Sequence, residues 1–494
     1  MLLSDLIQRI YTHYTHPASI TLSGQDRIIL TITQDSRYVS EGAMFAAIRG
    51  TAHNGEAYIT QAIEDGAVAI LCNAASLDTL EVPSHITLLV CDNPRKALSQ
   101  CAAMMHTHLT DICVAVTGTD GKTSVAEITR QLWEAAHIPA ASIGTMGLRC
   151  DHELQHMPTL SDNTSPEAVR FYHTLSLLSE QQVNHVVVEA SSHGLHQSRL
   201  HGLQVNAAIF TSFSQDHLDY HHSMDDYFAA KSVLFKELLT DNGRAILYAD
   251  DTRIMTLAQS LRDNYETLTY GMHEHADVRV EAITPIPKGQ HVSLYYNGEH
   301  YELNLPLYGT FQVYNVIASL LAVEATTTKH FAELVPLCLQ LNTVKGRLEL
   351  IGTTNESALV FVDYAHTPGA LEKALHTLRP YVSRKLHVVF GCGGDRDNNK
   401  RPKMGKVAQD YADEVIITDD NPRTENPEAI RNMIAEACPK ACVIPDRRTA
   451  IHTAMKQLHK GDVLLVAGKG HENYQIIGTT KHHFDDAEII CELV

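Results

Sequence analysis

Short apolar runs that each end in a cluster of small or polar residues constrain the fold of this chain more than any other feature. Runs of Val, Ile and Leu this short fit strands that are buried on both faces, as the strands of parallel sheets are. Segments with helical periodicity, such as "TSVAEITRQLWEAA" and "PGALEKALHTLRPYV", stand between them. The alternation predicts α/β domains, in which ligands bind at the carboxyl ends of the strands. The runs lie at 112–121, 185–194, 207–217, 358–366, 386–397, 415–423 and 462–472.

The length of the chain predicts more than one domain. At about 150 residues per domain, 494 residues suggest three. We expect seams near 105–111 and 343–347, and hence domains at 1–108, 109–344 and 345–494. The expected fold class is α/β in all three: an N-terminal α/β domain, a central P-loop domain with a mostly parallel sheet, and a C-terminal Rossmann-like domain.

The stretch 265–305 differs from the rest because its apolar and polar residues alternate. Asn297-Gly298 within it is typical of a two-residue hairpin turn. We therefore expect antiparallel strands to be added to the middle domain here.

Charge and cysteine content exclude several classes of function. A formal net charge of −19 argues against nucleic acid and anionic membranes as partners, because both require a basic face. No run approaches 18 apolar residues, and "MLLSDLIQRI" predicts an amphipathic helix, not a signal peptide. The ten cysteines include no C-x-x-C pair, and Cys438 and Cys442 lack partners for a zinc site. We expect buried free thiols and a cytoplasmic protein without membrane insertion.

A phosphate-binding loop stands between the first strand of the middle domain and a helical segment. It reads Gly118-Thr-Asp-Gly121-Lys122-Thr123-Ser124, and it is shortened, because the usual first glycine would fall at Val116. Backbone N–H groups at the start of the helix can bind phosphate oxygens, Lys122 supplies a charge, and Thr123 or Ser124 can hold Mg²⁺. The alternative is a glycine-containing turn before a helix. The loop alone leaves GTPase, kinase, motor and ligase open.

Two further residues have chemistry that the loop could use. Glu189 ends the run in "VVVEASSHGLHQSRL", where it is well placed as a second Mg²⁺ ligand. His193 could orient a substrate or could simply hydrogen-bond within its loop.

Lys231 lies in a helical segment. From that position alone, we expect its side chain to be solvated.

The loop and the segment "FTSFSQDHLDYHHSMDDYFAAKSVLF" together resemble the Mur ligases, which form amides with ATP in peptidoglycan precursor synthesis. That family has the shortened loop G-T-x-G-K-T, a D-H-x-D motif that corresponds to 216–219, and a helix with Y-x-x-x-K that corresponds to 227–231. The resemblance implies that Lys231 is carbamylated, so that it becomes an anion able to bind Mg²⁺. It implies His217 as a nitrogen ligand of the same ion, beside Thr123 and Glu189.

The resemblance extends over roughly 110–475 and implies a nucleotide site. "GTFQVYNVIAS" offers Asn315 for the base, "KGRLELI" offers Arg347 for the triphosphate on domain closure, and "VDYAH" offers Asp363 and His366. Departures from the family pattern are Asp120 and Gln312, each in place of Asn, and Gln215 in place of Arg. The ATP-binding set is Gly118, Thr119, Asp120, Gly121, Lys122, Thr123, Ser124, Asn315, Arg347 and Asp363, with Lys122, His217, Lys231 and Arg347 as catalytic residues.

The C-terminal motifs resemble those of the branch that adds meso-2,6-diaminopimelate. "FGCGGDRDNNKRP" supplies Arg396, and "TDDNPRTENP" contains the D-N-P-R motif of that branch. Two arginines can grip the second carboxylate of diaminopimelate, which lysine lacks, and a buried guanidinium left unpaired would disfavour lysine. The alternative for Arg423 is a turn arginine after Asn-Pro. The implied amino-acid site is Arg396, Asp420, Asn421, Pro422, Arg423, Gly468 and Glu472.

Two other segments resemble the region that binds the UDP-substrate. "TQDSRYVSEGAMFAAIRGTAHNG" would hold the uridine part, and "SDNTSPEA" with the stretch after Glu189 would hold the muramoyl-dipeptide. The implied residues are Ser36, Thr51, Ala52, His53, Asn163, Thr164, Ser165, Ser191, Gln197 and Arg199.

The resemblance thus implies one reaction. A monomeric cytoplasmic ligase would use ATP and Mg²⁺ to join meso-2,6-diaminopimelate to the D-glutamate γ-carboxylate of UDP-N-acetylmuramoyl-L-alanyl-D-glutamate, through an acyl phosphate. The alternatives are a lysine-adding relative or a folylpolyglutamate synthetase with the same ATP chemistry. A P-loop regulatory NTPase that forms no amide is the alternative from another class.

Overall fold

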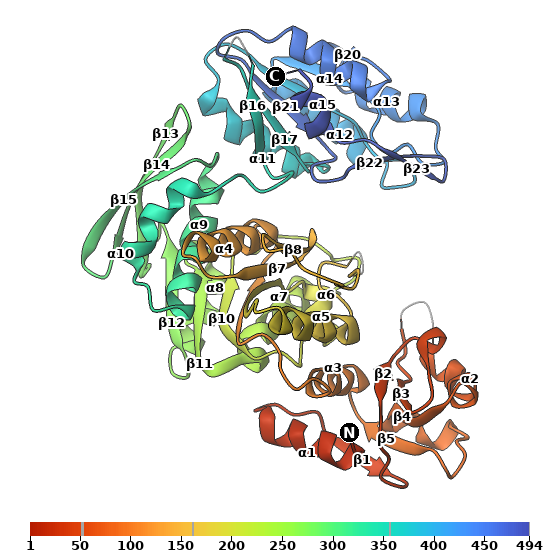
Figure 1. The fold of residues 1–494 in the computed structure, drawn as a ribbon. Helices are drawn as coiled ribbons and strands as arrows, with labels where there is room; N and C mark the ends of the chain where they lie inside the picture. The colour runs from red at the N-terminus through yellow and green to blue at the C-terminus, as the bar shows by residue number, and fades with distance from the viewer. Residues whose placement is uncertain (51–53, 161–162, 355–356, 494) are drawn as a thin grey trace. The chain divides into compact units, whose positions relative to one another are not determined.

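The chain consists of two compact units in a computed structural model that describes residues 1–50, 54–160, 163–354 and 357–493. The first unit comprises 1–279 and 314–335, and the second comprises 280–313 and 336–494. Figure 1 shows the helices and strands of both units. The division at 1–108, 109–344 and 345–494 stays a prediction.

The N-terminal part of the first unit is a five-stranded sheet in the order β1-β5-β4-β3-β2. Only β1 runs antiparallel to its neighbour. The predicted amphipathic N-terminal helix is α1, which buries Leu3, Leu6 and Ile10 in one core with α3. The bounds are α1 (Leu3–His13), β1 (Ile20–Ser23), β2 (Thr31–Thr33), η1 (Ser36–Tyr38), β3 (Ala43–Ala46), η2 (Gly55–Tyr58), α2 (Ile59–Glu64), β4 (Ala67–Asn73), η3 (Ala74–Thr79), β5 (Thr87–Cys91) and α3 (Pro94–Met104).

The remainder of the first unit is built on a sheet in which β12-β11-β10-β6-β9-β7-β8 follow one another. All of these strands are parallel except β8 at the edge. Because β9 and β10 flank β6, the segments that follow these three strands meet at one edge of the sheet. The strands are β6 (Ile112–Thr117), β7 (Ala140–Gly144), β8 (Gly147–Cys150), β9 (His185–Glu189), β10 (Val205–Phe210), β11 (Leu239–Tyr248) and β12 (Glu266–Gly271).

Helices cover this sheet, and one of them continues into a π-helical turn. Leu234–Leu238 form that turn directly after α7. The helices are α4 (Lys122–Ala135), α5 (Ala168–Glu180), α6 (Ser192–His196), α7 (Met224–Val233), α8 (Thr252–Leu261), α9 (Thr310–Thr326), which belongs to this unit from Tyr314 onward, and α10 (Phe331–Leu334). The short helix η5 (Val335–Gln340) belongs to the second unit from Pro336 onward.

The second unit begins within β13 (Val278–Ile286). Its next strands, β14 (Gly289–Tyr296) and β15 (Glu299–Leu305), form an antiparallel hairpin. Asn297 and Gly298 join them with positive φ angles of 51° and 86°, as the predicted two-residue turn requires.

A six-stranded sheet in the order β16-β17-β21-β18-β19-β20 forms the rest of the second unit. Only β16 is antiparallel, and two separate apolar cores pack against the sheet, one with α11, α12 and α13 and one with α14 and α15. The Rossmann-like arrangement is therefore confirmed. The bounds are β16 (Glu349–Thr353), β17 (Leu359–Asp363), α11 (Pro368–Leu378), η6 (Arg379–Tyr381), β18 (Leu386–Phe390), α12 (Lys400–Tyr411), β19 (Glu414–Ile417), α13 (Pro427–Ala435), β20 (Cys442–Val443), α14 (Arg447–Lys456), β21 (Val463–Ala467), β22 (Tyr474–Ile477), β23 (Thr480–His483) and α15 (Asp486–Cys491).

Each of the seven apolar runs forms a strand, and each of the three larger sheets is mostly parallel, so the α/β prediction is confirmed. All ten cysteines are free thiols, and only Cys442 and Cys491 are exposed. Within the described ranges, every helix is too short or too polar to cross a bilayer.

Candidate active site

The predicted phosphate loop connects β6 to α4, which begins at Lys122. Two glycines make its path possible. Gly118 has a φ of 148°, and a Cβ there would lie 1.9 Å from Thr211 Oγ1. Gly121 has a φ of 89°, and a Cβ there would lie 2.8 Å from Asn315 Oδ1. The structure therefore brings Asn315, which the sequence assigned to the nucleotide, to the loop.

The segment after β10 holds the loop by hydrogen bonds to its backbone. Ser212 O accepts from Thr119 N at 2.8 Å, and Ser212 Oγ accepts from Asp120 N at 3.0 Å. Thr211 Oγ1 donates to Asp120 O at 2.5 Å. Sequence reasoning missed both residues, although they lie in "FTSFSQDH" at the end of a predicted strand.

The side chains at the start of α4 point into the site. Lys122 Nζ donates to Gly118 O at 3.0 Å and to Thr119 O at 2.8 Å, so the ammonium lies over the loop. Thr123 Oγ1 donates to Glu189 Oε2 at 3.0 Å. Ser124 is buried in the same helical turn.

Glu189 ends β9, which pairs with β6 at Val116, and its side chain is 2% exposed. Its Oε1 accepts from Thr145 N at 2.8 Å, and its Oε2 accepts from Thr145 Oγ1 at 3.2 Å. A Cβ on Gly144 would lie 2.1 Å from Oε1. The carboxylate is thus fixed beside Thr123, and Thr145 is a residue that the sequence did not single out.

Lys231 lies inside the protein, so its interpretation as a solvated helix lysine is wrong. The residue is 1% exposed, and its Nζ donates to Gly118 O at 2.6 Å and lies 4.4 Å from the centre of the Tyr227 ring. Burial, with the charge of Lys122, lowers its pKa well below the ordinary lysine value. This favours the neutral amine, which is the form that reacts with CO₂.

His217 follows Asp216 in a left-handed conformation with a φ of 52°. Its backbone N–H donates to Asp216 Oδ1 at 2.8 Å, and its ring lies 4.9 Å from that of His193 and 6.1 Å from that of Tyr227. The imidazole is therefore near the aromatic ring that covers Lys231.

The oxygen atoms at the loop suit a magnesium ion. In the part of the chain that the structure describes, no three His, Cys, Asp or Glu side chains are grouped to hold a metal. The predicted ligands include other types, however: the Thr123 hydroxyl, 3.0 Å from the Glu189 carboxylate, and a carbamate on Lys231. Hard oxygen donors together with substrate phosphates are what Mg²⁺ prefers.

The residues predicted to hold the muramoyl-dipeptide form a hydrogen-bonded cluster. Ser165 Oγ donates to Glu189 O at 2.8 Å and lies 3.0 Å from Ser191 Oγ. Arg199 donates from Nη1 to Ser165 O and from Nη2 to Gln197 Oε1, both at 2.8 Å. The cluster is thus continuous with the proposed metal ligand.

Three other predicted UDP-substrate residues lie within the described part of the chain. Thr164 Oγ1 is 3.1 Å from Thr145 Oγ1, Asn163 is exposed, and Ser36 begins η1 in the N-terminal sheet region. Thr51, Ala52 and His53 lie outside the described residues.

In the second unit, Asp363 orders the backbone next to Arg347. Its Oδ2 accepts from Leu348 N at 2.7 Å and its Oδ1 accepts from Ala365 N at 2.8 Å. Burial raises the pKa of this carboxyl. The Arg347 guanidinium lies 5.1 Å from the centre of the Tyr364 ring.

The two arginines predicted for the second carboxylate flank one glycine. A Cβ on Gly393 would lie 2.9 Å from Arg423 Nη1 and 3.9 Å from Arg396 Cγ. Arg423 does occupy a turn, with a φ of 52°, and its Nη1 donates to Gly394 O at 2.9 Å. Its backbone N donates to Ile476 O at 3.1 Å, which ties it to β22.

The remaining amino-acid residues lie close together at the ends of β19 and β21. Asn421 Nδ2 donates to Glu472 Oε2 at 2.9 Å, and a Cβ on Gly468 would lie 2.7 Å from Asp420 Oδ2. Burial raises the pKa of Glu472. A Cβ on Gly394 would lie 1.9 Å from Pro422 O, so the D-N-P-R turn packs against the loop that carries Arg396.

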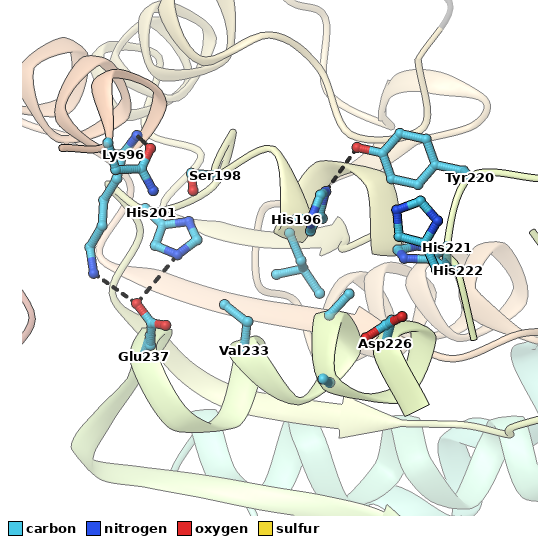
Figure 2. Close-up of a pocket in the computed structure, with 14 residues that line it drawn as sticks. Lys96, His196, Ser198, His201, Tyr220, His221, His222, Asp226, Val233 and Glu237 are labelled. Atoms are coloured by element: carbon cyan, nitrogen blue, oxygen red, sulfur yellow. Dashed lines mark hydrogen bonds and ion pairs between the residues drawn. The ribbon is translucent and has the colours of Figure 1, made fainter. Parts of the chain in front are cut away.

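A separate pocket of about 540 Å³ lies between α6 and α7. At one end Lys96 pairs with Glu237 at 2.7 Å, and at the other end His196 Nδ1 lies 2.9 Å from the Tyr220 hydroxyl (Figure 2). Its lining, among the described residues, includes none that the sequence assigned to a substrate. Tyr220 nevertheless accepts from Gln197 Nε2 at 3.1 Å and so joins the pocket to the muramoyl cluster.

Comparison with known proteins gives matches along nearly the whole chain. The models that match are the Mur ligase middle domain at 116–323, the Mur ligase glutamate ligase domain at 346–470 and the Mur ligase family catalytic domain at 29–106. A UDP-N-acetylmuramoyl-L-alanyl-D-glutamate–2,6-diaminopimelate ligase of Mesorhizobium japonicum is 41% identical over 490 residues, which are 99% of this chain and 98% of that protein. One of Brucella melitensis is 41% identical over 470 residues, 94% of each chain.

Solved structures agree with these matches. A structure of a UDP-N-acetylmuramoyl-L-alanyl-D-glutamate–2,6-diaminopimelate ligase has a TM-score of 0.71 and 32% identity over 95% of both chains. A folylpolyglutamate synthase of Mycobacterium tuberculosis has a TM-score of 0.59 and 19% identity over 76% of this chain and 92% of its own, which is a similarity of fold alone.

Proposed function

The chain belongs to the Mur ligase family, and we propose that it joins meso-2,6-diaminopimelate to the D-glutamate γ-carboxylate of UDP-N-acetylmuramoyl-L-alanyl-D-glutamate. It is an ATP-dependent acid–amino-acid ligase of peptidoglycan precursor synthesis. The amino-acid preference is supported by one observation above all: the Arg423 guanidinium and the Arg396 side chain both approach Gly393. Two arginines in that arrangement are suited to grip one carboxylate.

The first step transfers phosphate to the substrate. The γ-carboxylate of the D-glutamyl residue attacks the γ-phosphorus of ATP in line, the bond to the β-phosphate oxygen breaks, and an acyl phosphate and ADP result. Backbone N–H groups of the loop at 118–124 bind the phosphates, and Lys122 stabilises the negative charge that develops on the transferred group. Asn315 contacts the nucleotide. Arg347 is assigned to the triphosphate as a further cation from the sequence alone.

Thr123, Glu189, His217 and the carbamate of Lys231 would hold Mg²⁺. The ion supplies charge neutralisation for the phosphate oxygens when it is bound. The buried, hydrogen-bonded position of Lys231 supports the carbamate, because a neutral amine is held where an ammonium beside Lys122 is disfavoured.

The second step forms the amide. The free amine of diaminopimelate attacks the acyl carbon, phosphate leaves with the electrons of the acyl–oxygen bond, and the amine loses a proton. Arg396 and Arg423 bind the distal carboxylate, and Glu472, with Asp420 and Asn421 beside it, meets the distal ammonium end. Gly468 leaves room for Asp420, because any Cβ there would displace that carboxylate.

Substrate binding falls to the cluster of Ser165, Ser191, Gln197 and Arg199, with Asn163 and Thr164 beside it, and to Ser36 for the uridine part. Thr51, Ala52 and His53 are assigned to the same part from the sequence alone. We further propose that the protein acts as a monomer in the cytoplasm, where its nucleotide-linked substrate is made, and that it takes no nucleic acid.

Phosphate release tests this function. Purified protein with ATP, Mg²⁺ and UDP-N-acetylmuramoyl-L-alanyl-D-glutamate receives meso-diaminopimelate or L-lysine in parallel. Release that depends on diaminopimelate, with the matching mass gain on the UDP-dipeptide, is the expected result. Release with lysine instead would make it a lysine-adding relative, and release indifferent to both would make it an NTPase.

A further inference from the structure

Lys469 is a lysine that the proposed mechanism does not use, and it is fully buried. It stands after β21 between Gly468 and Gly470, whose φ angles of 114° and 53° are ones that side chains rarely adopt. Burying an ammonium is costly unless charged or polar partners surround it. The partners of Lys469 therefore indicate what the residue is for.

Among the described residues, the polar partners of its ammonium belong to the amino-acid site. Lys469 Nζ lies 3.2 Å from Asn421 Oδ1, 3.7 Å from Glu472 Oε2 and 4.0 Å from Asp420 Oδ1. The hydrogen-bond acceptor Asn421 and the two ion-pair partners come from two separate loops, after β19 and after β21. One cation thus holds together the groups proposed to meet the ammonium end of the substrate.

The contact with Asn421 fixes which way its amide points. Asn421 Oδ1 accepts from Lys469 Nζ and from Ile476 N, the latter at 2.9 Å. With the oxygen so engaged, Nδ2 faces Glu472 and donates to Oε2 at 2.9 Å. Loss of Lys469 removes one of the two donors that orient the amide and leaves two carboxylates without their shared cation.

We propose that Lys469 is a positioning residue for the amino-acid substrate, which orients Asn421 and Glu472 through its ammonium without touching the reacting atoms. The proposal rests on the proposed function, because it concerns the same amino-acid site. It assigns to Lys469 an effect on amino-acid binding and none on ATP or the UDP-dipeptide.

A dependence on pH follows from the charges around Glu472. The groups that face its carboxyl are Lys469, Asp420, Arg423, Arg447 and Tyr364. Burial raises the pKa of Glu472 and Lys469 opposes that rise. Removal of Lys469 therefore raises the pKa further, and Glu472 becomes neutral at a higher pH.

The test compares Lys469→Met with Lys460→Met in the same protein. Lys460 is an exposed lysine that precedes β21, whereas Lys469 follows that strand, so Lys460 is a control lysine at the opposite end of the strand from the amino-acid site. Phosphate release gives KM for meso-diaminopimelate, ATP and UDP-dipeptide, and kcat/KM for diaminopimelate is followed against pH. Thermal unfolding checks that each variant is folded.

For Lys469→Met we expect KM for diaminopimelate to rise about 10- to 150-fold, the range for a lost hydrogen bond to a charged group. The KM values for the other two substrates stay within about twofold, and the acid limb of kcat/KM moves to higher pH. Lys460→Met should behave as the wild type. Lys469→Gln, which keeps a donor to Asn421 without the charge, should show an intermediate KM with the same pH shift.

Two failures can be told apart. Wild-type protein without amino-acid-dependent phosphate release would overturn the proposed function, and the role of Lys469 with it. An active wild type with an unchanged diaminopimelate KM and pH profile in Lys469→Met would overturn the role of Lys469 alone. Loss of folding in both Lys469→Met and Lys469→Gln would make the residue structural and would also overturn it.

Discussion

Replacing Arg423 by methionine is the change that tests the amino-acid preference most directly. Methionine keeps much of the side-chain length and is apolar, so the variant removes the guanidinium with little loss of volume. The left-handed backbone at this position, with a φ of 52°, is as unfavourable for methionine as for arginine, so the substitution adds no backbone strain. Its effect is therefore that of the lost charge and donors.

The expected size follows from the contacts of Arg423. Nη1 is used by Gly394 O at 2.9 Å, so that contact anchors the guanidinium beside Gly393 and Arg396. One charge-assisted hydrogen bond to the substrate carboxylate contributes about 1.5–3 kcal/mol, which is about 10- to 150-fold in kcat/KM. L-Lysine lacks that carboxylate, so its kcat/KM should change by less than about threefold, and the preference for diaminopimelate should shrink by nearly the whole factor.

The assay is phosphate release with each amino acid at saturating ATP and UDP-dipeptide. Arg448→Met is the control, because Arg448 makes an exposed ion pair with Glu492 at 2.6 Å on the surface of α14. Arg423→Lys should fall between the wild type and Arg423→Met, since an ammonium keeps the charge but lacks the planar fork. A wild-type ratio of diaminopimelate to lysine in folded Arg423→Met would refute the assignment of Arg423 to the second carboxylate.

Three further predictions concern other parts of the site. Glu189→Gln should raise the Mg²⁺ concentration for half-maximal activity at least about tenfold, because an amide offers one oxygen where Thr123 and Thr145 use two. A magnesium titration of phosphate release measures this concentration, and an unchanged midpoint would contradict the assignment of Glu189 as a ligand. Gly118→Ala should weaken ADP binding at least about tenfold in calorimetry, because the added Cβ would lie 1.9 Å from Thr211 Oγ1. Gly147→Ala should bind ADP normally, because Gly147 also has a positive φ but a Cβ there would meet no atom within 4 Å. Burial lowers the pKa of His471 to about 4, so between about pH 6.5 and 4 the unfolded chain binds a proton that the folded chain does not, and the free energy of unfolding falls as the pH falls. His471→Phe should lose less of that free energy between pH 7 and pH 4.5, as measured by urea unfolding. An equal loss in the wild type and the variant would contradict this role of His471.

The sequence predicted those features that depend on neighbouring residues. The strands followed from local runs, the Asn297-Gly298 turn from its two residues, and the phosphate loop from glycines at the end of a strand. Features made by distant segments were out of reach. Thr211 and Ser212 hold the loop across more than 90 residues of chain, and Thr145 holds Glu189 from 44 residues away.

Lysines show this difference most clearly. Lys122 could be assigned because its loop is a local pattern, whereas Lys231 lies in a helix whose local sequence predicts a solvated side chain. Its ammonium is buried against Gly118, which lies 113 residues earlier in the chain, and under the Tyr227 ring. Lys469 was within a quoted motif, but its partners at 420 and 421 come from another strand end, and no pattern in its own segment points to them.

The burial of Lys231 has a consequence for how its proposed carbamate is made and lost. The Lys231 amine lies under the Tyr227 ring, and the residue is 1% exposed. Bicarbonate is charged and would have to lose its hydration water to reach this amine. Dissolved CO₂ is small and uncharged and can diffuse to it. The modification would therefore follow the gas dissolved in the medium and not the larger pool of bicarbonate. Two preparations with the same sequence and fold could then differ in activity according to the atmosphere in which each was last handled.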